Sequence, residues 1–346
     1  MDLSLSEEQL ALRGAYSTLL SAHCTAADVR ASEPAGFDSD LWSRTVDMGL
    51  TGMGLPENMG GGGASLEDLV VVAQECGAHL APVPFVESLV AGRLMAAAGA
   101  KELAEAVADG TLVPTVVLHP VAVEKETRVL VPAGAVAEVV LALDRGDLVA
   151  FERLPDERPH TQPVPNFGCQ PMAEWDLADP SLRKTLLISG SAAGAMYERA
   201  VDEWRVLTAA ALNGLRGTAL EIGLSYIKNR KAFGTLIGAF QAVQHRLADV
   251  AVAGEGAELL TFEAAWAADR GEPDAAILAG YALSFSARTA FMTCREALQF
   301  HGGYGVTLEY DIQLYFRRAK AWPLALGDLA LEEQRAAVMS FPASQS

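Results

Sequence analysis

The sequence has little cysteine and no long apolar run. Its four cysteines are widely separated, and none belongs to a Cys-x-x-Cys pair or a Cys/His cluster, so no metal site is expected. Scattered thiols fit a reducing compartment, and we expect the cytoplasm. The N-terminus lacks a basic segment followed by an apolar one, so we expect no secretory signal. No stretch reaches the roughly 18 uninterrupted apolar residues of a membrane span.

Basic residues are also scarce relative to acidic ones. The chain has 26 Lys and Arg against 44 Asp and Glu, which gives a formal net charge of −18. Such an excess of negative charge argues against nucleic acid or an anionic membrane surface as a partner. An anionic cofactor would therefore have to be held by local cations and helix ends rather than by the overall field of the protein.

The helical and β-rich patterns along the chain indicate an α+β fold that is mainly α. Residues 1–111 are predicted to be helical, with capping boxes opening helices at Ser6 and Ser65. Residues 112–186 contain short β-rich runs, among them 113–123, 129–131 and a hairpin that pairs 139–143 with 148–151. Residues 187–346 return to long helices that suggest a bundle. Glycines 214, 217 and 223 inside a helical pattern are predicted to mark close packing.

The rest of the chain is organised around a predicted helix–turn–helix at Gly234. Apolar residues recur at helical spacing on both sides of it, at Leu220, Leu224 and Ile227 before the turn and at Phe240, Val243, Leu247 and Val250 after it. Arg230 stands just before the break, where a cation suits the negative end of a helix. On spacing alone, the segment is a helical hairpin with Arg230 solvated and Phe233 in the core.

Four motifs in order carry a family resemblance. Arg230, Phe233 and Gly234 form Arg-x-x-Phe-Gly and are followed by Ile237 and by Phe240-Gln241. Gln299-Phe-His-Gly-Gly-Tyr-Gly305 and then Arg317-Arg-Ala-Lys320 come later, and Glu57–Gly63 follows Gly49–Pro56 near the start. At this spacing the chain resembles the acyl-CoA dehydrogenase family, flavoenzymes that oxidise acyl-CoA thioesters. The resemblance implies an N-terminal helical domain (1–111), a trimmed middle β-domain (112–186) and a C-terminal four-helix bundle (187–346).

The resemblance also implies FAD as cofactor. Arg230 would reach its pyrophosphate through a charge-assisted contact, and Phe233 and Gln241 would lie along its adenosine half. The cofactor would also meet the glycine-rich turn, at Gln299, Phe300, His301, Gly302 and Gly303. The resemblance assigns Arg205 and Tyr304 to the acyl-CoA substrate. In family enzymes the FAD contacts are made largely to the neighbouring chain's cofactor, which implies an oligomer.

The other half of the family's FAD site is missing. The β-domain normally carries a Thr-Glu…Gly-Ser-Asp segment and a Trp-x-Thr/Ser segment against the isoalloxazine ring. The matching region here is Val116–Glu126, which has neither, and no tryptophan occurs between Trp42 and Trp175. The resemblance therefore describes a chain suited to completing a partner's flavin site rather than to holding the ring of its own.

The family's catalytic carboxylate is missing as well. The usual glutamate stands before a Gly-Thr pair, and that register gives Leu326 here. Some relatives place it one residue before an arginine on the earlier helix, and that register gives Trp204, followed by Arg205. Neither leucine nor indole accepts a proton at neutral pH. Glu203 and Asp328 are the nearest weak candidates for a displaced base.

Four interpretations remain open. The first is a subunit of a hetero-oligomer whose second acyl-CoA dehydrogenase chain supplies the glutamate, similar to paired actinobacterial enzymes that shorten steroid side chains. The second is a self-sufficient homo-oligomeric dehydrogenase that uses Glu203 or Asp328. The third is a flavin-free scaffold or binding protein. The fourth is oxygen-using or dehydratase chemistry on the same fold, which needs no base at those places.

Overall fold

The computed structural model describes residues 4–123, 127–153 and 162–341. They form two compact units. The bundle unit comprises Met1–Val29, Val70–Ala81 and Arg205–Ser346, and the sheet unit comprises Arg30–Leu69 and Pro82–Trp204. Three helices run from one unit into the other: α2 (Ala26–Ser32), α4 (Leu66–Ala78) and α7 (Ser191–Asn229). The units interleave along the sequence, and the boundaries at 111/112 and 186/187 stay a prediction.

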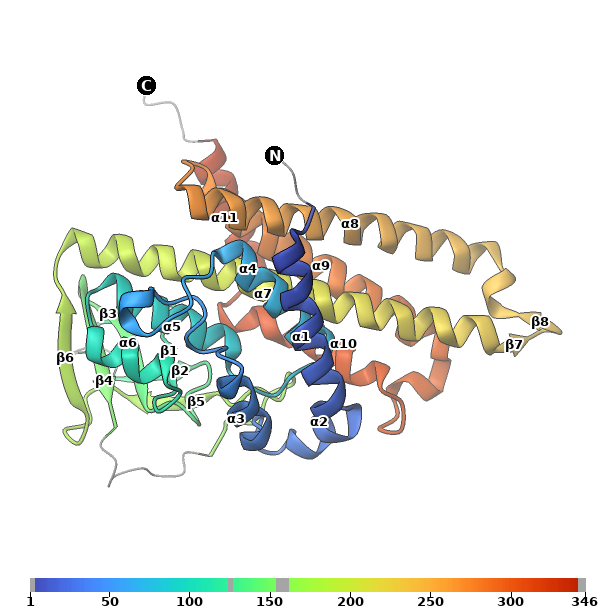
Figure 1. Ribbon diagram of the computed structural model, residues 1–346. Coiled ribbons are helices and arrows are strands. Elements are labelled where there is room, and N and C mark those ends of the chain that lie inside the picture. Colours follow the sequence, from blue (N-terminus) through green and yellow to red (C-terminus); the bar gives the residue numbers. More distant parts are fainter. Residues whose placement is uncertain (1–3, 124–126, 154–161, 342–346) are drawn as a thin grey trace. The chain divides into compact units, whose positions relative to one another are not determined.

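The bundle unit is built of helices. Besides its parts of α4 and α7 it holds α1 (Glu7–His23), α8 (Gln241–Arg270), α9 (Ala275–His301), α10 (Ile312–Ala321) and α11 (Leu329–Ser340). Short 3-10 turns stand at η3 (Ile237–Ala239), η4 (Gly302–Val306) and η5 (Trp322–Ala325). The helix α9 packs along α8, α10 and α11, and the two long helices α8 and α9 lie side by side in Figure 1.

Local signals explain where several of these helices begin and end. Ser6 accepts a hydrogen bond from the Gln9 amide while the Gln9 side chain accepts from the Ser6 amide, so the predicted capping box of α1 is confirmed. Gly271 ends α8 in the left-handed conformation, with φ +67°. The segment Ala275–Val306 is long and apolar enough to cross a membrane, but half of its most apolar window is buried, as in the core helix of a bundle.

The predicted glycine packing is right at two of three positions on α7. A Cβ on Gly214 would lie 1.8 Å from the Gln74 carbonyl oxygen, and a Cβ on Gly223 would lie 2.9 Å from the Ala297 Cβ. At both places only glycine lets the neighbouring helix approach this closely. The prediction is wrong for Gly217, where an added Cβ would meet nothing within 4 Å.

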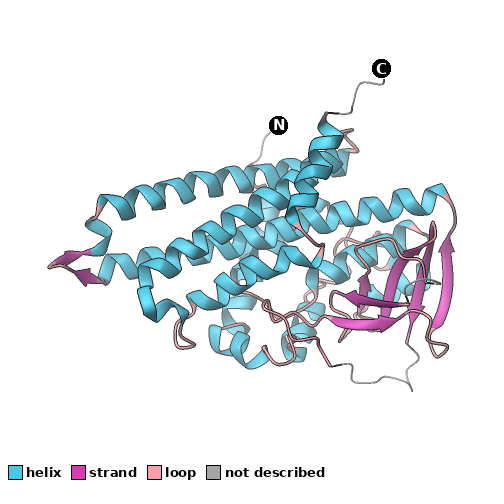
Figure 2. Ribbon diagram, turned by 180° about the vertical axis from the view of Figure 1, so that it is seen from behind, coloured by secondary structure: helices cyan, strands magenta, loops and turns pink. Residues whose placement is uncertain are grey.

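The sheet unit holds the strands. The helices α3 (Ser39–Asp47), α5 (Phe85–Ala97) and α6 (Lys101–Ala108) and the turn η1 (Glu57–Met59) accompany a sheet of order β1-β3-β4-β6. Its strands are β1 (Pro114–Val116), β3 (Val139–Asp144), β4 (Asp147–Glu152) and β6 (Arg183–Ile188). A second pair joins β2 (Arg128–Val131) to β5 (Ala173–Asp176). Figure 2 shows the strands of this unit grouped together.

Two predictions about this sheet have different outcomes. The hairpin is confirmed, because β3 and β4 pair around Arg145 and Gly146, both at positive φ as a two-residue primed turn requires. The predicted run 113–123 is wrong beyond β1, since the strand ends at Val116 and only Val121 bridges Asp144 again. The reason is Pro120, which donates no amide hydrogen bond. Val117, Val140, Phe151 and Trp175 close the core beneath.

Candidate functional site

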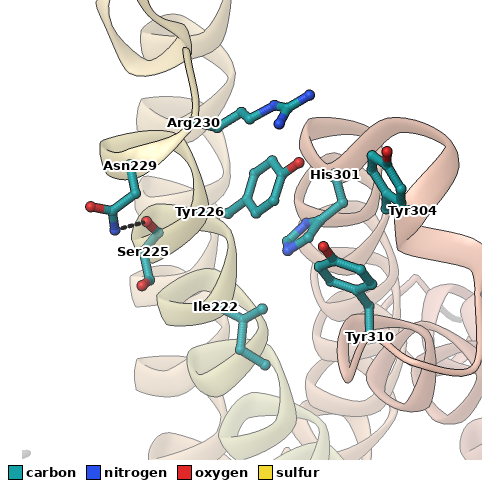
Figure 3. A pocket seen from close by; sticks show the side chains of 8 residues that line it. All are labelled: Ile222, Ser225, Tyr226, Asn229, Arg230, His301, Tyr304 and Tyr310. Carbon is teal, nitrogen blue, oxygen red and sulfur yellow. Dashed lines mark hydrogen bonds between the residues drawn. The ribbon is translucent and has the colours of Figure 1, made fainter.

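A cavity of about 720 Å³ opens in the bundle unit where α7 ends. Residues from the last two turns of α7 form one wall, and residues from the end of α9 and the following turn form the other (Figure 3). The lining residues are Ile222, Ser225, Tyr226, Asn229, Arg230, His301, Tyr304 and Tyr310. Arg230 and residues of the glycine-rich run, which are far apart in sequence, thus line one cavity, and their binding of a cofactor stays a prediction.

The predicted turn at Gly234 is a minimal β-hairpin beside this cavity. β7 (Lys231–Ala232) pairs with β8 (Thr235–Leu236), and Phe233 and Gly234 form the tip at φ +54° and +81°. A left-handed conformation suits glycine but costs about 1–2 kcal/mol for a residue with a side chain. The Phe233 side chain is 97% exposed, so the expectation of a core aromatic is wrong. An exposed ring on a strained backbone is typical of a position kept for contact with another molecule.

Arg230 is the cation of the cavity. Its side chain is exposed, and the structure gives it no ion pair among the described residues. Its backbone is fixed on both sides, because its amide donates to the Tyr226 carbonyl and its own carbonyl accepts from the Ile237 amide. A guanidinium without a counter-ion in a protein of net charge −18 is available to an anionic ligand.

Four aromatic rings line the cavity, Tyr226 from α7 and the other three from the wall that faces it. His301 stacks on Tyr226 with ring centroids 4.0 Å apart, and Tyr310 meets the His301 ring edge-on at 5.6 Å. The His301 Nδ1 lies 2.7 Å from the Ala297 carbonyl oxygen, which can only accept, so Nδ1 carries the hydrogen. In the neutral ring Nε2 is then the acceptor. Tyr304 is 54% exposed and leaves a flat aromatic face available for stacking.

The glycines after His301 shape the rim. Gly302 has φ +62° with ψ −141°, a conformation open to glycine alone, and it ends α9. Gly305 is held close to α9, since a Cβ there would lie 2.7 Å from the Leu298 carbonyl oxygen. Gly302 and Gly303 are exposed with open space around them, so their backbone is accessible to a ligand.

Several predicted cofactor residues stand near the cavity without lining it. Gln241 is the exposed first residue of α8, and Gln299 and Phe300 occupy the last turn of α9. Tyr226 and Tyr310 line the cavity and were not predicted. The helical spacing offers a signal for Tyr226, because it stands one turn before Arg230 on the same face. Nothing in the sequence around Tyr310 indicates its position.

Arg205 does not share this cavity with Tyr304. It precedes Arg230 by roughly seven helical turns and is buried, with its Nε and Nη2 bonded to the Glu332 carboxylate of α11 at 2.6 and 3.2 Å. The two substrate residues suggested by the resemblance are therefore not brought together here. Leu326, in the family's base position, is 4% exposed and nonpolar.

Each weak base candidate already has a structural role. In the sheet unit, the Glu203 carboxylate receives two hydrogen bonds from Arg93, at 2.8 and 3.1 Å. Both residues line a smaller cleft of about 340 Å³. In the bundle unit, Asp328 caps α11 by accepting from the Ala330 amide at 3.0 Å. Glu203 and Asp328 therefore both take part in contacts that hold the fold.

One carboxyl group with an unusual environment was not predicted. Burial raises the pKa of Glu87 on α5 above its ordinary value, although its own backbone amide and the nearby Trp204 indole act in the opposite direction. Trp204 is 1% exposed and stands at the second family base position. A carboxyl group thus lies beside the second family base position. The sequence gives no sign of it, because Glu87 lies far from Trp204 along the chain.

No metal-binding group accompanies these residues. Among the residues that the structure describes, no three His, Cys, Asp or Glu side chains are grouped so as to hold an ion. The chemistry of the cavity is that of one cation, aromatic faces and exposed backbone. This combination suits a nucleotide, whose phosphates pair with arginine and whose base stacks on an aromatic ring.

Comparisons with known proteins agree with the sequence motifs. Residues 6–111 match the family described as acyl-CoA dehydrogenase, N-terminal domain, and residues 194–338 match acyl-CoA dehydrogenase, C-terminal domain. The curated acyl-CoA dehydrogenase IpdE2 of Mycolicibacterium smegmatis is 30% identical over 327 residues, covering 93% of this chain and 96% of the relative. IpdE2 of Mycobacterium tuberculosis is 32% identical over 320 residues, covering 90% and 91%.

Solved structures give the same result for the fold. A steroid acyl-CoA dehydrogenase (ACAD), Tcur3481-Tcur3483, superposes with a TM-score of 0.86 at 27% identity, over 99% of this chain and 100% of that one. The ChsE4-ChsE5 complex from Mycobacterium tuberculosis superposes with a TM-score of 0.83 at 24% identity, over 100% of both chains.

Proposed function

The chain belongs to the acyl-CoA dehydrogenase family, whose members oxidise acyl-CoA thioesters with FAD, and we propose that it works there as one subunit of a cytoplasmic hetero-oligomer. In this proposal its bundle unit completes the FAD site of a second family chain. That second chain carries the glutamate that removes the substrate's α-proton. The substrate is an acyl-CoA thioester, and the similarity to a steroid ACAD favours a steroid side chain as its acyl group.

The proposal rests on two observations taken together. Arg230 lines a cavity, and neither family base position carries a carboxylate. Leu326 and Trp204 occupy the two family base positions, and both are buried. Glu203 is bonded to Arg93 and Asp328 caps α11, so neither is free to move into the role. Arg230, by contrast, has kept its cavity and has no ion-pair partner among the described residues. A chain that kept the cofactor contact but lost the acid is expected to depend on another chain.

The residues of the cavity fit the nucleotide half of FAD. Arg230 would hold the pyrophosphate, the exposed ring of Tyr304 would stack on the adenine, and the Nε2 of His301 would accept from a ribose or ribityl hydroxyl. Phe233 would pack against the adenosine from the hairpin tip. When bound, FAD supplies the acceptor for the substrate's β-hydrogen. This chain would orient the cofactor and keep water from it, and the partner would move the proton.

The similarity to two-chain enzymes supports a partner of the same family. The structures similar to this chain include the ChsE4-ChsE5 complex, which pairs two differently named chains. The sequence of the Val116–Glu126 segment, of which residues 124–126 lie outside the described residues, lacks the motifs with which the family holds the flavin ring. The ring would then be held by the partner's β-domain.

The test is purification of the chain with and without a family chain that carries the Glu-Gly-Thr motif. We expect the joint preparation to be yellow and to reduce an electron-accepting dye with acyl-CoA. The chain alone is expected to do neither. Robust dehydrogenation by the chain alone would contradict the proposal. Colourless protein in both preparations would favour the flavin-free scaffold instead.

A second candidate function is a self-sufficient dehydrogenase with a displaced base, and Glu87 is the observation that favours it. Its raised pKa and its position beside Trp204 would place a carboxyl group near one of the lost base positions. This function predicts dye reduction by the chain alone that Glu87→Gln abolishes while flavin content stays unchanged. The same loss in Glu203→Gln or Asp328→Asn would identify one of those residues instead. Equal rates in all three variants would exclude a base on this chain.

A further inference from the structure

The Tyr226 ring bridges the two walls of the cavity that Arg230 lines. It stacks on the His301 ring at the end of α9, with ring centroids 4.0 Å apart and ring planes inclined by 28°. Both side chains line the cavity (Figure 3). The stacking thus connects the helix that ends beside Arg230 to the helix that leads into the glycine-rich turn.

A close approach of two helices sets the spacing of this ring pair. A Cβ on Gly223, about one turn before Tyr226 on α7, would lie 2.9 Å from the Ala297 Cβ on α9. Ala297 in turn stands about one turn before His301, and its carbonyl oxygen lies 2.7 Å from the His301 Nδ1. Because residues three and four apart share a helix face, the contact at Gly223 brings the two rings into register.

Further contacts fix the orientation of the His301 ring. Its Nδ1 donates to the Ala297 carbonyl, and the Tyr310 ring meets its edge at 5.6 Å with the planes inclined by 73°. The His301 side chain is largely buried, yet its Nε2 has no hydrogen-bond partner among the described residues. Unlike the Tyr16 hydroxyl, this nitrogen is not sealed from solvent. The cavity therefore presents a hydrogen-bond acceptor at a fixed place.

We propose that Tyr226 is a positioning residue, which holds the His301 Nε2 where it accepts a hydrogen bond from the ribose of a bound nucleotide. This inference rests on the proposed function, in which Arg230 holds the pyrophosphate and Tyr304 stacks on the adenine. The adenosine ribose joins those two groups, so an acceptor in the same cavity faces its hydroxyls. The ligand class is a nucleotide with an unmodified ribose, and Tyr226 contributes to the selection through His301 rather than through its own hydroxyl.

ADP and 2′,3′-dideoxy-ADP form a matched pair of probes, because they differ only in the ribose hydroxyls. Isothermal titration of the assembled complex, after its flavin has been removed, measures both affinities. We expect ADP to bind more tightly, on the order of five-fold, as one net hydrogen bond provides. Tyr226→Leu should abolish this preference, because the His301 ring loses the surface that holds it. Tyr226→Phe keeps the stacked ring and should retain the preference.

Two further variants complete the test. His301→Leu removes the acceptor itself and should bring the two affinities to the same value, which keeps the inference testable if Tyr226→Leu does not fold. Tyr281→Leu is the matched control, since Tyr281 is also a half-buried tyrosine of the bundle unit but does not line the cavity. It should leave the preference for ADP unchanged.

Equal affinities of the two probes for the wild-type complex would overturn the inference, as would an unchanged preference in Tyr226→Leu or His301→Leu. Loss of the preference in Tyr226→Phe would assign the ribose contact to the Tyr226 hydroxyl and overturn it too. In each of these cases, a complex that still holds FAD leaves the proposed function standing. A complex that binds neither FAD nor ADP would contradict the proposed function itself.

Discussion

At the scale of single residues, some polar and aromatic side chains are held in contacts within the fold, and others are left exposed. Glu203, Asp328 and Arg205 look like catalytic or substrate residues in the sequence, yet each is engaged in a cap or a buried ion pair. Arg230 and Phe233 are in the opposite position, since Arg230 has no ion pair among the described residues and the Phe233 side chain is 97% exposed. Residues that the fold leaves unused are the better indication of what the chain binds.

Arg230→Ala is expected to weaken flavin retention in the assembled enzyme. Loss of one charge-assisted contact to the pyrophosphate costs about 1.5–3 kcal/mol, or roughly 10- to 150-fold in the dissociation constant of the cofactor. Flavin release during dialysis, followed by absorbance, measures it. Lys228→Ala is the matched control, because Lys228 is an exposed cation two residues earlier that does not line the cavity. Equal flavin loss in both variants would refute a specific role for Arg230.

Phe233→Asn is expected to have opposite effects on the stability of the lone chain and on its assembly into a complex. Asparagine tolerates the left-handed backbone better than phenylalanine, so the free energy of unfolding of the lone chain should rise by about 1 kcal/mol. The same change removes the exposed ring, so the flavin-bound complex should form less readily. Thermal unfolding of the chain and titration with its partner measure the two effects. A less stable chain would contradict the backbone strain at Phe233, and assembly as tight as in the wild type would show that the ring has no role in binding.

At the scale of elements, helix packing decides which glycines are required. Gly214 and Gly217 stand three residues apart on α7 and look alike in the sequence. The first faces the Gln74 carbonyl across a helix contact, and the second faces open space. Periodicity places both residues on a helix but does not show which neighbour comes close, because that depends on contacts between segments distant in sequence.

Gly214→Ala and Gly217→Ala therefore have opposite expected effects. The methyl group at 214 must displace α4 from α7, and overpacking of this kind costs about 1–3 kcal/mol of unfolding free energy. At 217 the methyl group meets nothing, and alanine's higher helix propensity raises the free energy of unfolding by about 1 kcal/mol. Urea unfolding followed by circular dichroism distinguishes the two variants. Changes of the same sign would contradict the close approach of the helices at Gly214.

The helices, strands and turns also show how much of the fold can be predicted from the sequence. Capping residues, the Arg145-Gly146 turn and the Gly234 break are local features, and each is confirmed. The strand predicted over 113–123 is wrong because Pro120 outweighs the β-branched residues around it. In the cavity, Arg230 and His301 are found through motifs, whereas Tyr310 becomes apparent only through the fold. Outside the cavity, the same holds for Glu87 and the Arg205–Glu332 pair.

At the scale of the whole molecule, the net charge of −18 opposes folding at low ionic strength. Raising the ionic strength from about 0.01 M to about 0.15 M shortens the Debye length from about 30 Å to about 8 Å. The melting temperature of the lone chain should therefore rise over this range. Scanning calorimetry in NaCl and in KCl tests it, and equal shifts in the two salts exclude binding of a particular cation. A constant or falling melting temperature would show that self-repulsion is unimportant.

The hairpin tip between α7 and α8 has a consequence for how such a protein is made. A ring that is 97% exposed on a left-handed backbone gains little for a solitary polypeptide. In the proposed hetero-oligomer, copies produced in excess of the partner would present it to chaperones and proteases as a mark of incomplete assembly. Synthesis of the two polypeptides in matched amounts would then protect both of them, and an unbalanced supply would be corrected by degradation.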